Sequence, residues 1–184
     1  MISYNGIWSA DEAKPENYPK SEKLANNLLF LLHQGVYVID FGCGDGYYLD
    51  HLHHNGFKFV IGIDGIKSTD HKWIMQKDLS VPHTFPWRGY VLSLEVGEHI
   101  PVEYEQAFID NLCRHCSNRM IISWAIPGQR GLGHVNCRPN DYVISEIEKR
   151  GFKFNKNVTD FLRSDIERGV RYFKDTLMVF DKNV

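Results

Sequence analysis

The sequence predicts an α/β protein built on a doubly wound, mostly parallel β-sheet. Short apolar runs rich in β-branched residues alternate along the chain with segments of helical periodicity. The first run, residues 36–39, leads into three glycines at alternate positions, Gly42, Gly44 and Gly46, and a helical pattern follows. A strand, a glycine turn and a helix in this order bring backbone N–H groups close to a nucleotide-like ligand. We expect some of these glycines to have φ > 0.

The N-terminal third of the chain is predicted to hold an arm and two helices. Residues 1–20 contain Tyr4, Trp8 and Tyr18, which is too aromatic for a free tail, so we expect an ordered arm, either a staple on the core or a lid over the active site. A helix is predicted over residues 21–34, where Ser21 supplies the cap, leucines recur at helical spacing and Gly35 ends the helix. The helix after the glycine turn is expected to end near residues 55–56.

The rest of the chain supplies the remaining strands and helices. Six further strands are predicted over residues 57–63, 72–76, 90–94, 120–125, 152–155 and 176–181. Helices are predicted over residues 101–115, 139–150 and near 161–167. There is little room for a helix between the second and fourth strands, so that crossover is abbreviated. The length predicts one domain over residues 1–184, with residues 1–20 as its arm.

The composition excludes several classes of protein. With 43% hydrophobic and 24% charged residues and a net charge of −2, the chain lacks the basic excess usual in an obligate nucleic-acid binder. No apolar run approaches the ~20 residues that span a bilayer, and the polar first 20 residues carry no secretory signal. Four unevenly spaced cysteines indicate free thiols in a reducing compartment. We therefore expect a cytoplasmic protein with neither a membrane nor a nucleic-acid partner.

An acid follows each of four consecutive predicted strands: Asp40, Asp64, Asp78 and Glu95. Ligands of doubly wound sheets bind off these carboxyl ends. A dinucleotide site has the spacing G-x-G-x-x-G, but here the spacing is G-x-G-x-G, with Tyr47 in place of the third glycine. An acid before the turn is unfavourable for a diphosphate and favourable for a cation. The pattern therefore favours S-adenosylmethionine, which carries a sulfonium and an ammonium group but no phosphate.

Each acid then has a physical role in binding this cofactor. Asp40 lies near the methionine end, and Asp64, at the usual interval after the glycines, takes the ribose hydroxyls. Asp78 accepts from the adenine amine with Leu79 beside the ring, and Glu95 lies below the reacting centre. The predicted cofactor site consists of Asp40, Gly42, Cys43, Gly44, Asp64, Gly65, Asp78, Leu79 and Glu95.

Two segments carry a resemblance to a known family. Residues 40–46, Asp-Phe-Gly-Cys-Gly-Asp-Gly, are similar to motif I of the class I S-adenosylmethionine-dependent methyltransferases. Residues 92–101, Leu-Ser-Leu-Glu-Val-Gly-Glu-His-Ile-Pro, resemble the segment after the fourth strand in many members that act on small molecules. The resemblance covers roughly residues 21–181. It implies a Rossmann-like sheet of seven strands, the last antiparallel, and methyl transfer from S-adenosylmethionine.

Methyl transfer is an in-line displacement from an activated sulfonium, so positioning supplies much of the catalysis, with effective molarities that reach ~10⁵ M or more. An oxygen acceptor must also lose a proton, and a base contributes ~10²–10⁴-fold. The candidate catalytic residues are Glu98 and His99 after the fourth strand and His134 in the glycine-rich loop after the fifth. The structural alternatives are a His99 that braces the entry to the next helix and a solvated His134.

A metal-assisted version of this chemistry is an alternative. Glu95, Glu98, His99 and His134 resemble the Glu-x-x-Glu-His plus distant His set of the small-RNA 2′-O-methyltransferases, which bind a divalent ion. The same segment is frequent in metal-free relatives, so we predict no metal ligand. A divalent-metal-assisted RNA or sugar 2′-O-type methyltransferase is kept as an alternative function.

The cysteines suggest a second metal pattern, which the predicted fold opposes. Cys113, Cys116, His134 and Cys137 have the zinc-like spacing C-x₂-C…H-x₂-C. The first pair precedes the fifth strand and the second pair follows it. About six strand residues at ~3.3 Å each put ~20 Å between the pairs.

The sequence as a whole predicts an S-adenosylmethionine-dependent methyltransferase that acts on a small-molecule or sugar acceptor, at oxygen in preference to nitrogen. The loop after the fourth strand lacks the Asp/Asn-Pro-Pro-Tyr pattern of amino-methylating nucleic-acid enzymes and the Pro-Cys nucleophile of cytosine-C5 enzymes. Two further alternatives remain open: a nicotinamide-dependent oxidoreductase, and a non-catalytic module that binds S-adenosylmethionine.

Overall fold

The computed structural model describes residues 3, 5–9, 11–66 and 71–183. The seven strands are β1 (Tyr37–Phe41), β2 (Val60–Asp64), β3 (Ile74–Gln76), β4 (Gly89–Leu94), β5 (Cys116–Ser123), β6 (Phe152–Phe154) and β7 (Leu177–Lys182). The α-helices are α1 (Glu22–Leu31), α2 (Tyr47–His54), α3 (Glu105–His115), α4 (Asn140–Glu148), α5 (Lys156–Ser164) and α6 (Phe173–Thr176). Short 3₁₀ helices are η1 (Pro15–Asn17), η2 (Gly97–His99), η3 (Val102–Tyr104) and η4 (Arg168–Val170).

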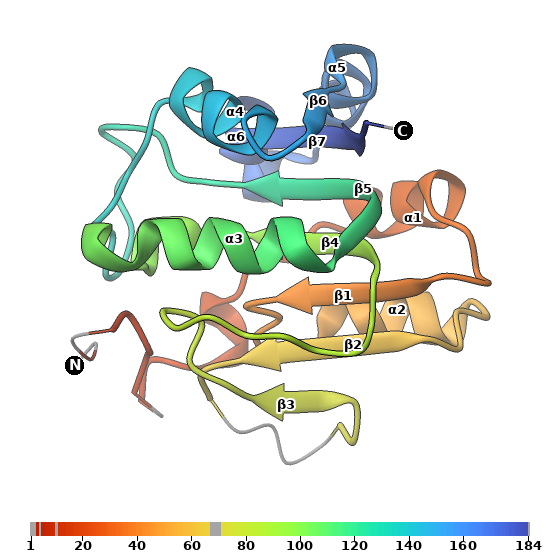
Figure 1. The fold of residues 1–184 in the computed structure, drawn as a ribbon, viewed down its shortest axis with the longest axis horizontal. Coiled ribbons are helices and arrows are strands. Elements are labelled where there is room, and N and C mark those ends of the chain that lie inside the picture. The colour runs from red at the N-terminus through yellow and green to blue at the C-terminus, as the bar shows by residue number, and fades with distance from the viewer. Residues whose placement is uncertain (1–2, 4, 10, 67–70, 184) are drawn as a thin grey trace.

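The strands form one sheet in the order β3-β2-β1-β4-β5-β7-β6 (Figure 1). The pairs from β3 to β5 are parallel, and β7 runs antiparallel to both β5 and β6. The strand order reverses between β1 and β4, and in such sheets the crevice at this reversal is the usual ligand site. The predicted doubly wound sheet of seven strands with an antiparallel last strand is confirmed.

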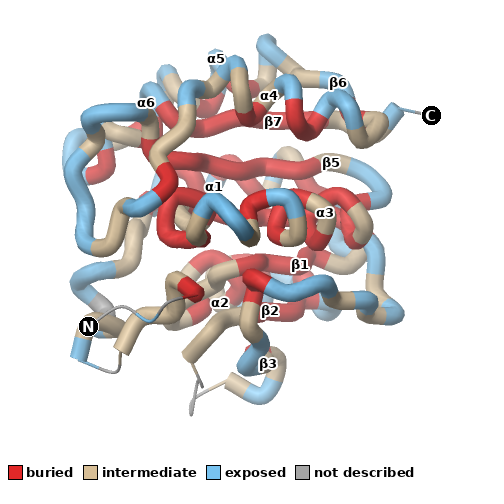
Figure 2. Tube along the Cα trace, turned by 60° about the vertical axis from the view of Figure 1, so that its left-hand side comes forward, coloured by how far each residue is buried: buried red, intermediate tan, exposed pale blue. Residues whose placement is uncertain are grey.

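The core consists of two layers, one on each face of the sheet, because side chains alternate between the faces along each strand. Val38 and Leu92 pack with α1, α2 and α5 on one face, while Ile39 and Val91 pack with α3 and α4 on the other. Figure 1 shows α3 in front of the sheet and α2 behind it, and Figure 2 shows β1, β5 and β7 as buried strands. Burial on both faces explains why these strands are continuous apolar runs in the sequence.

Several element boundaries differ from the sequence-based predictions. The helix predicted near residues 161–167 is wrong in position, because α5 begins at Lys156, where the Asn155 side chain accepts the Val158 N–H (3.0 Å) as a cap. The fifth strand begins at Cys116 rather than residue 120, since Cys116 still pairs with β4 and Arg119 pairs with β7. The first helix ends at Leu31 instead of residue 34. The helix predicted over residues 101–115 divides into η3 and α3.

The abbreviated crossover between the second and fourth strands is also seen. No helix lies between β2 and β4 in the described residues 65–66 and 71–88.

Within the described chain, no helix has both the length and the apolar character needed to cross a bilayer.

Candidate functional site

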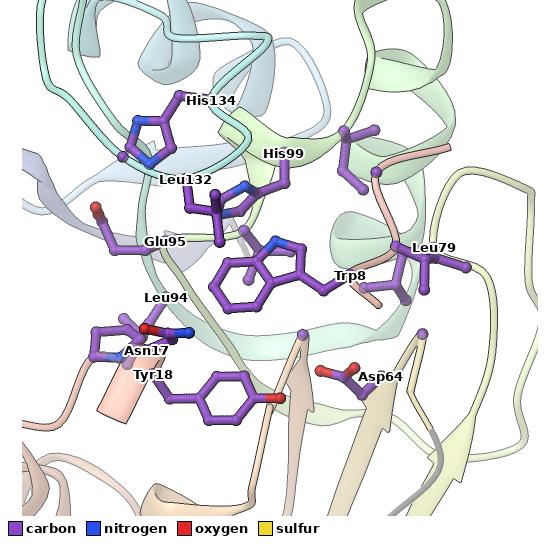
Figure 3. A pocket seen from close by; sticks show the side chains of 18 of the residues that line it. Trp8, Asn17, Tyr18, Asp64, Leu79, Leu94, Glu95, His99, Leu132 and His134 are labelled. Carbon is purple, nitrogen blue, oxygen red and sulfur yellow. The ribbon is translucent and has the colours of Figure 1, made fainter. Parts of the chain in front are cut away.

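A cavity of about 370 Å³ opens at the carboxyl ends of the parallel strands, beside the reversal in strand order (Figure 3). This size falls in the range of small-molecule sites. Seven of the predicted site residues line it: Gly42, Asp64, Gly65, Leu79, Glu95, His99 and His134. Figure 3 shows Asp64 and Leu79 towards one end, Glu95 and His134 towards the other, and Trp8 between them.

The glycine turn has the backbone that the sequence predicted. Gly42, Gly44 and Gly46 have φ values of 81°, 55° and 85°, a region that side chains disfavour. A Cβ at Gly42 would collide with the Val96 side chain, and one at Gly44 would lie 2.5 Å from the Tyr18 ring. The turn therefore needs glycine both for its backbone conformation and for close packing against neighbouring loops.

Asp64 joins this turn to the end of β2. Its Oδ2 accepts the Gly44 N–H (2.8 Å) and its Oδ1 accepts the Ile66 N–H (2.9 Å). Burial raises the pKa of Asp64, while the backbone hydrogen bonds oppose that rise. The carboxylate lines the cavity, in position to accept hydrogen bonds from a ligand.

Asp40, Cys43 and Gly44 do not line the cavity. Asp40 is buried in β1, and burial, followed by the charge of Asp64, raises the pKa of Asp40 to about 7. The Cys43 sulfur packs against Gly62 of β2, and burial raises the pKa of this thiol well above its ordinary value. The structure therefore places these three predicted cofactor residues outside the lining of the cavity.

Asp78 is also set back from the cavity, whereas the adjacent Leu79 lines it. Asp78 Oδ1 accepts from both the backbone N–H (2.9 Å) and the hydroxyl (2.6 Å) of Ser80. Its Oδ2 accepts from the side-chain amide of Asn5 (2.7 Å). A residue of the N-terminal arm thus stands in front of the acid predicted to bind adenine.

Glu95 has a strained backbone and a firmly held side chain. It is the one non-glycine residue with positive φ (54°) in the described part of the chain, and such outliers cluster at functional sites. Gln129 donates to Oε2 (2.6 Å) and Thr176 to Oε1 (3.1 Å), while the Glu95 N–H donates to the Ser123 hydroxyl (2.8 Å). Burial raises the pKa of Glu95.

Glu98 is completely buried and does not line the cavity. Among the described residues, neither of its carboxylate oxygens has a hydrogen-bond partner. His134 Nε2 lies 3.8 Å from Glu98 Oε1. Burial and the nearby charge of Glu95 raise the pKa of Glu98 well above its ordinary value.

His99 and His134 face each other across 5.1 Å between ring centroids. His99 Nδ1 lies 3.2 Å from the Gly133 carbonyl, and His134 Nδ1 lies 3.2 Å from the Gln129 carbonyl. Because a carbonyl oxygen only accepts, each Nδ1 carries the proton and each Nε2 of the neutral ring keeps its lone pair. Burial, with a contribution from His134, lowers the pKa of His99 to about 4.

The loop between β5 and α4 is held by a buried network that the sequence did not indicate. Asn136 donates its side-chain N–H to Glu105 (2.9 Å), accepts from the Trp124 indole at its carbonyl (2.7 Å) and donates its backbone N–H to the Glu98 carbonyl (2.9 Å). Arg138 Nε (2.6 Å) and the Tyr142 hydroxyl also donate to Glu105. This network fixes the loop that carries His134.

The N-terminal arm covers the cavity, as the lid interpretation expected. Trp8 meets the edge of His99 with 5.2 Å between ring centroids and stacks with Tyr18 at 5.8 Å. Ile7 packs against Gly65, and Asn5 and Asn17 also line the cavity. Asn5, Ile7 and Asn17 were not predicted, since nothing local in the sequence assigns them a ligand. Tyr4 lies outside the described residues.

The described residues contain one group of side chains able to hold a metal ion, namely Glu98, His99 and His134, with one ligand atom from each within 4.8 Å of the others. Cys113 lies in the last turn of α3 and Cys116 begins β5, at the other end of the strand from His134 and Cys137. The four cysteines are free. The zinc-like spacing therefore does not bring its residues together.

No protein-family model matches the sequence, and no curated protein matches it. Solved structures do match. The magnesium protoporphyrin IX methyltransferase ChlM of Synechocystis PCC 6803, determined with bound SAM, has a TM-score of 0.64 at 19% sequence identity, covering 88% of this chain and 77% of that chain. The glycopeptide N-methyltransferase MtfA, complexed with S-adenosyl-L-methionine, has a TM-score of 0.61 at 13% identity, covering 90% and 88%.

The chain has the class I methyltransferase fold. The family resemblance drawn from the glycine turn is therefore confirmed for the fold. The [4+2]-cyclase SpnF matches with a TM-score of 0.61 at 12% identity, covering 88% of this chain and 80% of that chain. Because a cyclase also has the class I methyltransferase fold, the activity of this chain must be argued from its site.

Proposed function

We propose that this protein is an S-adenosylmethionine-dependent methyltransferase that acts on a small-molecule or sugar acceptor, at oxygen in preference to nitrogen. One observation carries the proposal: a single cavity joins an acid beside a glycine turn to a second end lined by two histidines, each with its Nδ1 against a backbone carbonyl. Asp64, which accepts the Gly44 N–H of the turn, lines the first end, and His99 and His134 line the second. The first end suits the cofactor, and the second suits an acceptor that must lose a proton.

Each lining residue has a role in this proposal. Asp64 accepts hydrogen bonds from the ribose hydroxyls, and Leu79 packs against the adenine ring. When bound, S-adenosylmethionine supplies an electrophilic methyl group on a sulfonium, and the half-buried carboxylate of Glu95 favours its positive charge. The cavity walls orient the two reacting groups, which supplies effective concentration.

The acceptor proton needs a base within the cavity. His99 and His134 both line it and both keep an Nε2 lone pair, so either can take the proton as the acceptor oxygen attacks. Because the pKa of His99 is lowered to about 4, its ring is neutral at pH 7. Glu98 is buried outside the cavity lining and does not contact the acceptor. Its Oε1 lies 3.8 Å from His134 Nε2, so its role is to position the His134 ring.

Calorimetry with S-adenosylhomocysteine tests the cofactor assignment. We expect saturable binding by the wild type and a loss of about 100-fold in Asp64→Ala, since hydrogen bonds to a charged group contribute roughly 1.5–3 kcal/mol each. Asp110→Ala, which removes an acid paired with Arg150 on the surface of α3, is the matched control and binds as the wild type. The absence of any heat with the wild type would overturn the proposal.

Two alternative functions raised by the sequence would give different results in binding and activity measurements. Tight binding of NADH in the same titration would favour a nicotinamide-dependent oxidoreductase. Cofactor binding without formation of S-adenosylhomocysteine, across a panel of hydroxylated and sugar acceptors, would favour a non-catalytic binding module. Product formation with any acceptor supports the methyltransferase.

A divalent-metal-assisted methyltransferase is a second candidate function, favoured by a specific observation. The buried carboxylate of Glu98 has no hydrogen-bond partner among the described residues, and it lies beside two imidazoles whose Nδ1 atoms are held by carbonyls. Metal-binding histidines are held in this way by a second-shell acceptor. The residues fit an ion, and Glu98, His99 and His134 would hold it. The ion would lower the pKa of an acceptor hydroxyl.

Cobalt absorption spectroscopy distinguishes this candidate from metal-free catalysis. Saturable Co²⁺ binding by the wild type that is lost in Glu98→Gln supports a metal site. Glu95→Gln is the comparison, because the Glu95 oxygens already accept from Gln129 and Thr176. If Co²⁺ shows no saturable binding to the wild type, the metal-assisted function is wrong and the metal-free one stands.

A further inference from the structure

Asn5 occupies the position from which a ligand beside Leu79 would be recognised. Asn5 and Leu79 both line the cavity, whereas Asp78 does not. Asn5 is only 8% exposed, so its amide is a buried polar group beside a ligand cavity. Its hydrogen bond to Asp78 spans 73 residues of sequence and places the arm directly in front of this acid.

The orientation of the Asn5 amide is fixed by its two partners. Nδ2 donates to Asp78 Oδ2 (2.7 Å), and Oδ1 accepts from the Ser3 hydroxyl. An asparagine side chain has two N–H donors and two carbonyl lone pairs. Within the part of the chain that the structure describes, one donor and one lone pair therefore remain for a ligand. The amide cannot flip without breaking both of these hydrogen bonds.

The surroundings of Asn5 suit a flat heteroaromatic ring. Ile7, Ile66, Leu79 and Ile100 line the cavity with Asn5 and supply apolar surface. One N–H beside one carbonyl oxygen pairs with the edge of an adenine, which offers an amino donor next to a ring-nitrogen acceptor. Hypoxanthine replaces that amino group with a carbonyl oxygen, which would face the Asn5 carbonyl and be repelled.

We propose that Asn5 of the N-terminal arm is the residue that recognises the adenine edge of the cofactor, and that Asp78 is a positioning residue behind it. This inference rests on the proposed function. It changes the role predicted for Asp78, which does not contact the adenine but holds the amide that does. The arm then determines specificity for the adenine base of the cofactor and also lines the cavity.

The state of Asp78 fits this role. Although burial opposes it, hydrogen bonds from Ser80 and Asn5 hold the pKa of Asp78 below its ordinary value. The carboxylate is therefore ionised at neutral pH and can only accept. It selects the amide orientation in which Nδ2 points towards Asp78 and Oδ1 points away from it.

A comparison of the affinities of two ligands tests the proposal in the full-length protein. Kd values are measured by calorimetry for S-adenosylhomocysteine and for S-inosylhomocysteine, in which the adenine amino group is replaced by a carbonyl oxygen. We expect the wild type to prefer the adenosyl ligand by about 10–100-fold, the range for one or two hydrogen bonds of which one is replaced by repulsion. In Asn5→Ala the preference falls to within about threefold.

Two further variants separate recognition from positioning and from general damage. Asp78→Ala leaves Asn5 free to flip, so it also loses the preference while keeping a measurable affinity for both ligands. Asn17→Ala removes another asparagine of the arm that lines the cavity, one that donates to the Glu12 carbonyl (2.7 Å), and keeps the wild-type preference. The ratio of two Kd values is independent of the fraction of protein that is folded, so a destabilised variant still gives an answer.

The outcomes also separate this inference from the proposed function. If the wild type binds neither ligand, the proposed function itself is wrong. If the wild type binds and prefers the adenosyl ligand, but Asn5→Ala keeps the full preference, the assignment of Asn5 is overturned and the cofactor proposal stands. A wild type without any preference overturns adenine-edge recognition by Asn5 in the same way.

Discussion

Burial shifts the pKa values of one acid and one histidine near this cavity, Asp40 and His99. Asp40 and Asp64 end neighbouring strands, and the pKa of Asp40 is raised to about 7 by burial and by the charge of Asp64. The pKa of His99 is lowered instead, to about 4. In both cases the buried position disfavours the charged form. The residue types were predicted from the sequence, but these protonation states depend on their depth in the fold.

The raised pKa of Asp40 predicts a stability loss with rising pH. The folded state holds the Asp40 proton up to about pH 7, whereas the unfolded chain releases it near pH 4. The unfolded state therefore binds fewer protons in this window, and stability decreases from about pH 4 to 7 by up to roughly 1.4 kcal/mol per pH unit. Asp40→Asn removes this contribution.

Urea denaturation at pH 5, 6 and 7 checks the Asp40 prediction. The free energy of unfolding of the wild type should fall relative to that of Asp40→Asn across the series. The difference between the two proteins isolates Asp40 from His99, whose lowered pKa gives a slope of the opposite sign between about pH 4 and 6.5. Parallel curves for the two proteins would show that Asp40 titrates normally.

The loop between β5 and α4 illustrates how an irregular element becomes a rigid one. Glu105 at the start of α3 is 2% exposed and accepts from Asn136, Arg138 and Tyr142. Hydrogen bonds to Glu98 and from Trp124 hold the same loop from the other side. The loop is glycine-rich in sequence, but it is fixed by buried polar contacts that no local pattern reveals.

Removal of Glu105, which accepts hydrogen bonds from Asn136, Arg138 and Tyr142, should destabilise the protein more than removal of one of these donors. We expect Glu105→Ala to cost about 3 kcal/mol, because Arg138 and Asn136 both lose a buried partner. Tyr142→Phe removes one hydrogen bond and should cost about 1 kcal/mol. Both values come from urea denaturation at pH 7. Equal costs for the two variants would mean that Glu105 does not organise the loop.

The whole molecule places its cofactor-side residues on elements far apart in sequence. The arm, the turn after β1, the end of β2 and the loop after β3 meet at one edge of the sheet (Figure 1). A ligand that contacts them all ties the arm to the sheet and stabilises the folded state by mass action. That residues 1–184 form one domain stays a prediction.

S-adenosylhomocysteine should therefore raise the melting temperature. At a concentration of 100 times its Kd, a ligand adds about 2.7 kcal/mol, which corresponds to a shift of about 5–10 °C for a protein of this size. Differential scanning calorimetry measures the shift. Asp64→Ala at the same ligand concentration should show little change, and an equal shift in this variant would place the ligand elsewhere.

Features that depend on neighbouring residues in the chain were predictable. Strands buried on both faces must be apolar, a turn that approaches a ligand needs glycine, and parallel strands bring their terminal acids to one edge. The sheet, the glycine turn and the location of Asp64 and Leu79 at the cavity follow from these rules. Short elements and boundaries were less accurate, because α5 and the first half of β5 are set by a cap and by strand pairing.

Other features depend on contacts between distant segments, and these only the three-dimensional structure reveals. Nothing near Asn5 in the sequence points to Asp78. Nothing near Glu98 shows that its carboxylate is buried beside His134 without a hydrogen-bond partner among the described residues. The physical reason is that burial and hydrogen-bond partnership belong to pairs of groups brought together by folding. Local sequence sets the types of these groups, and packing determines which of them meet.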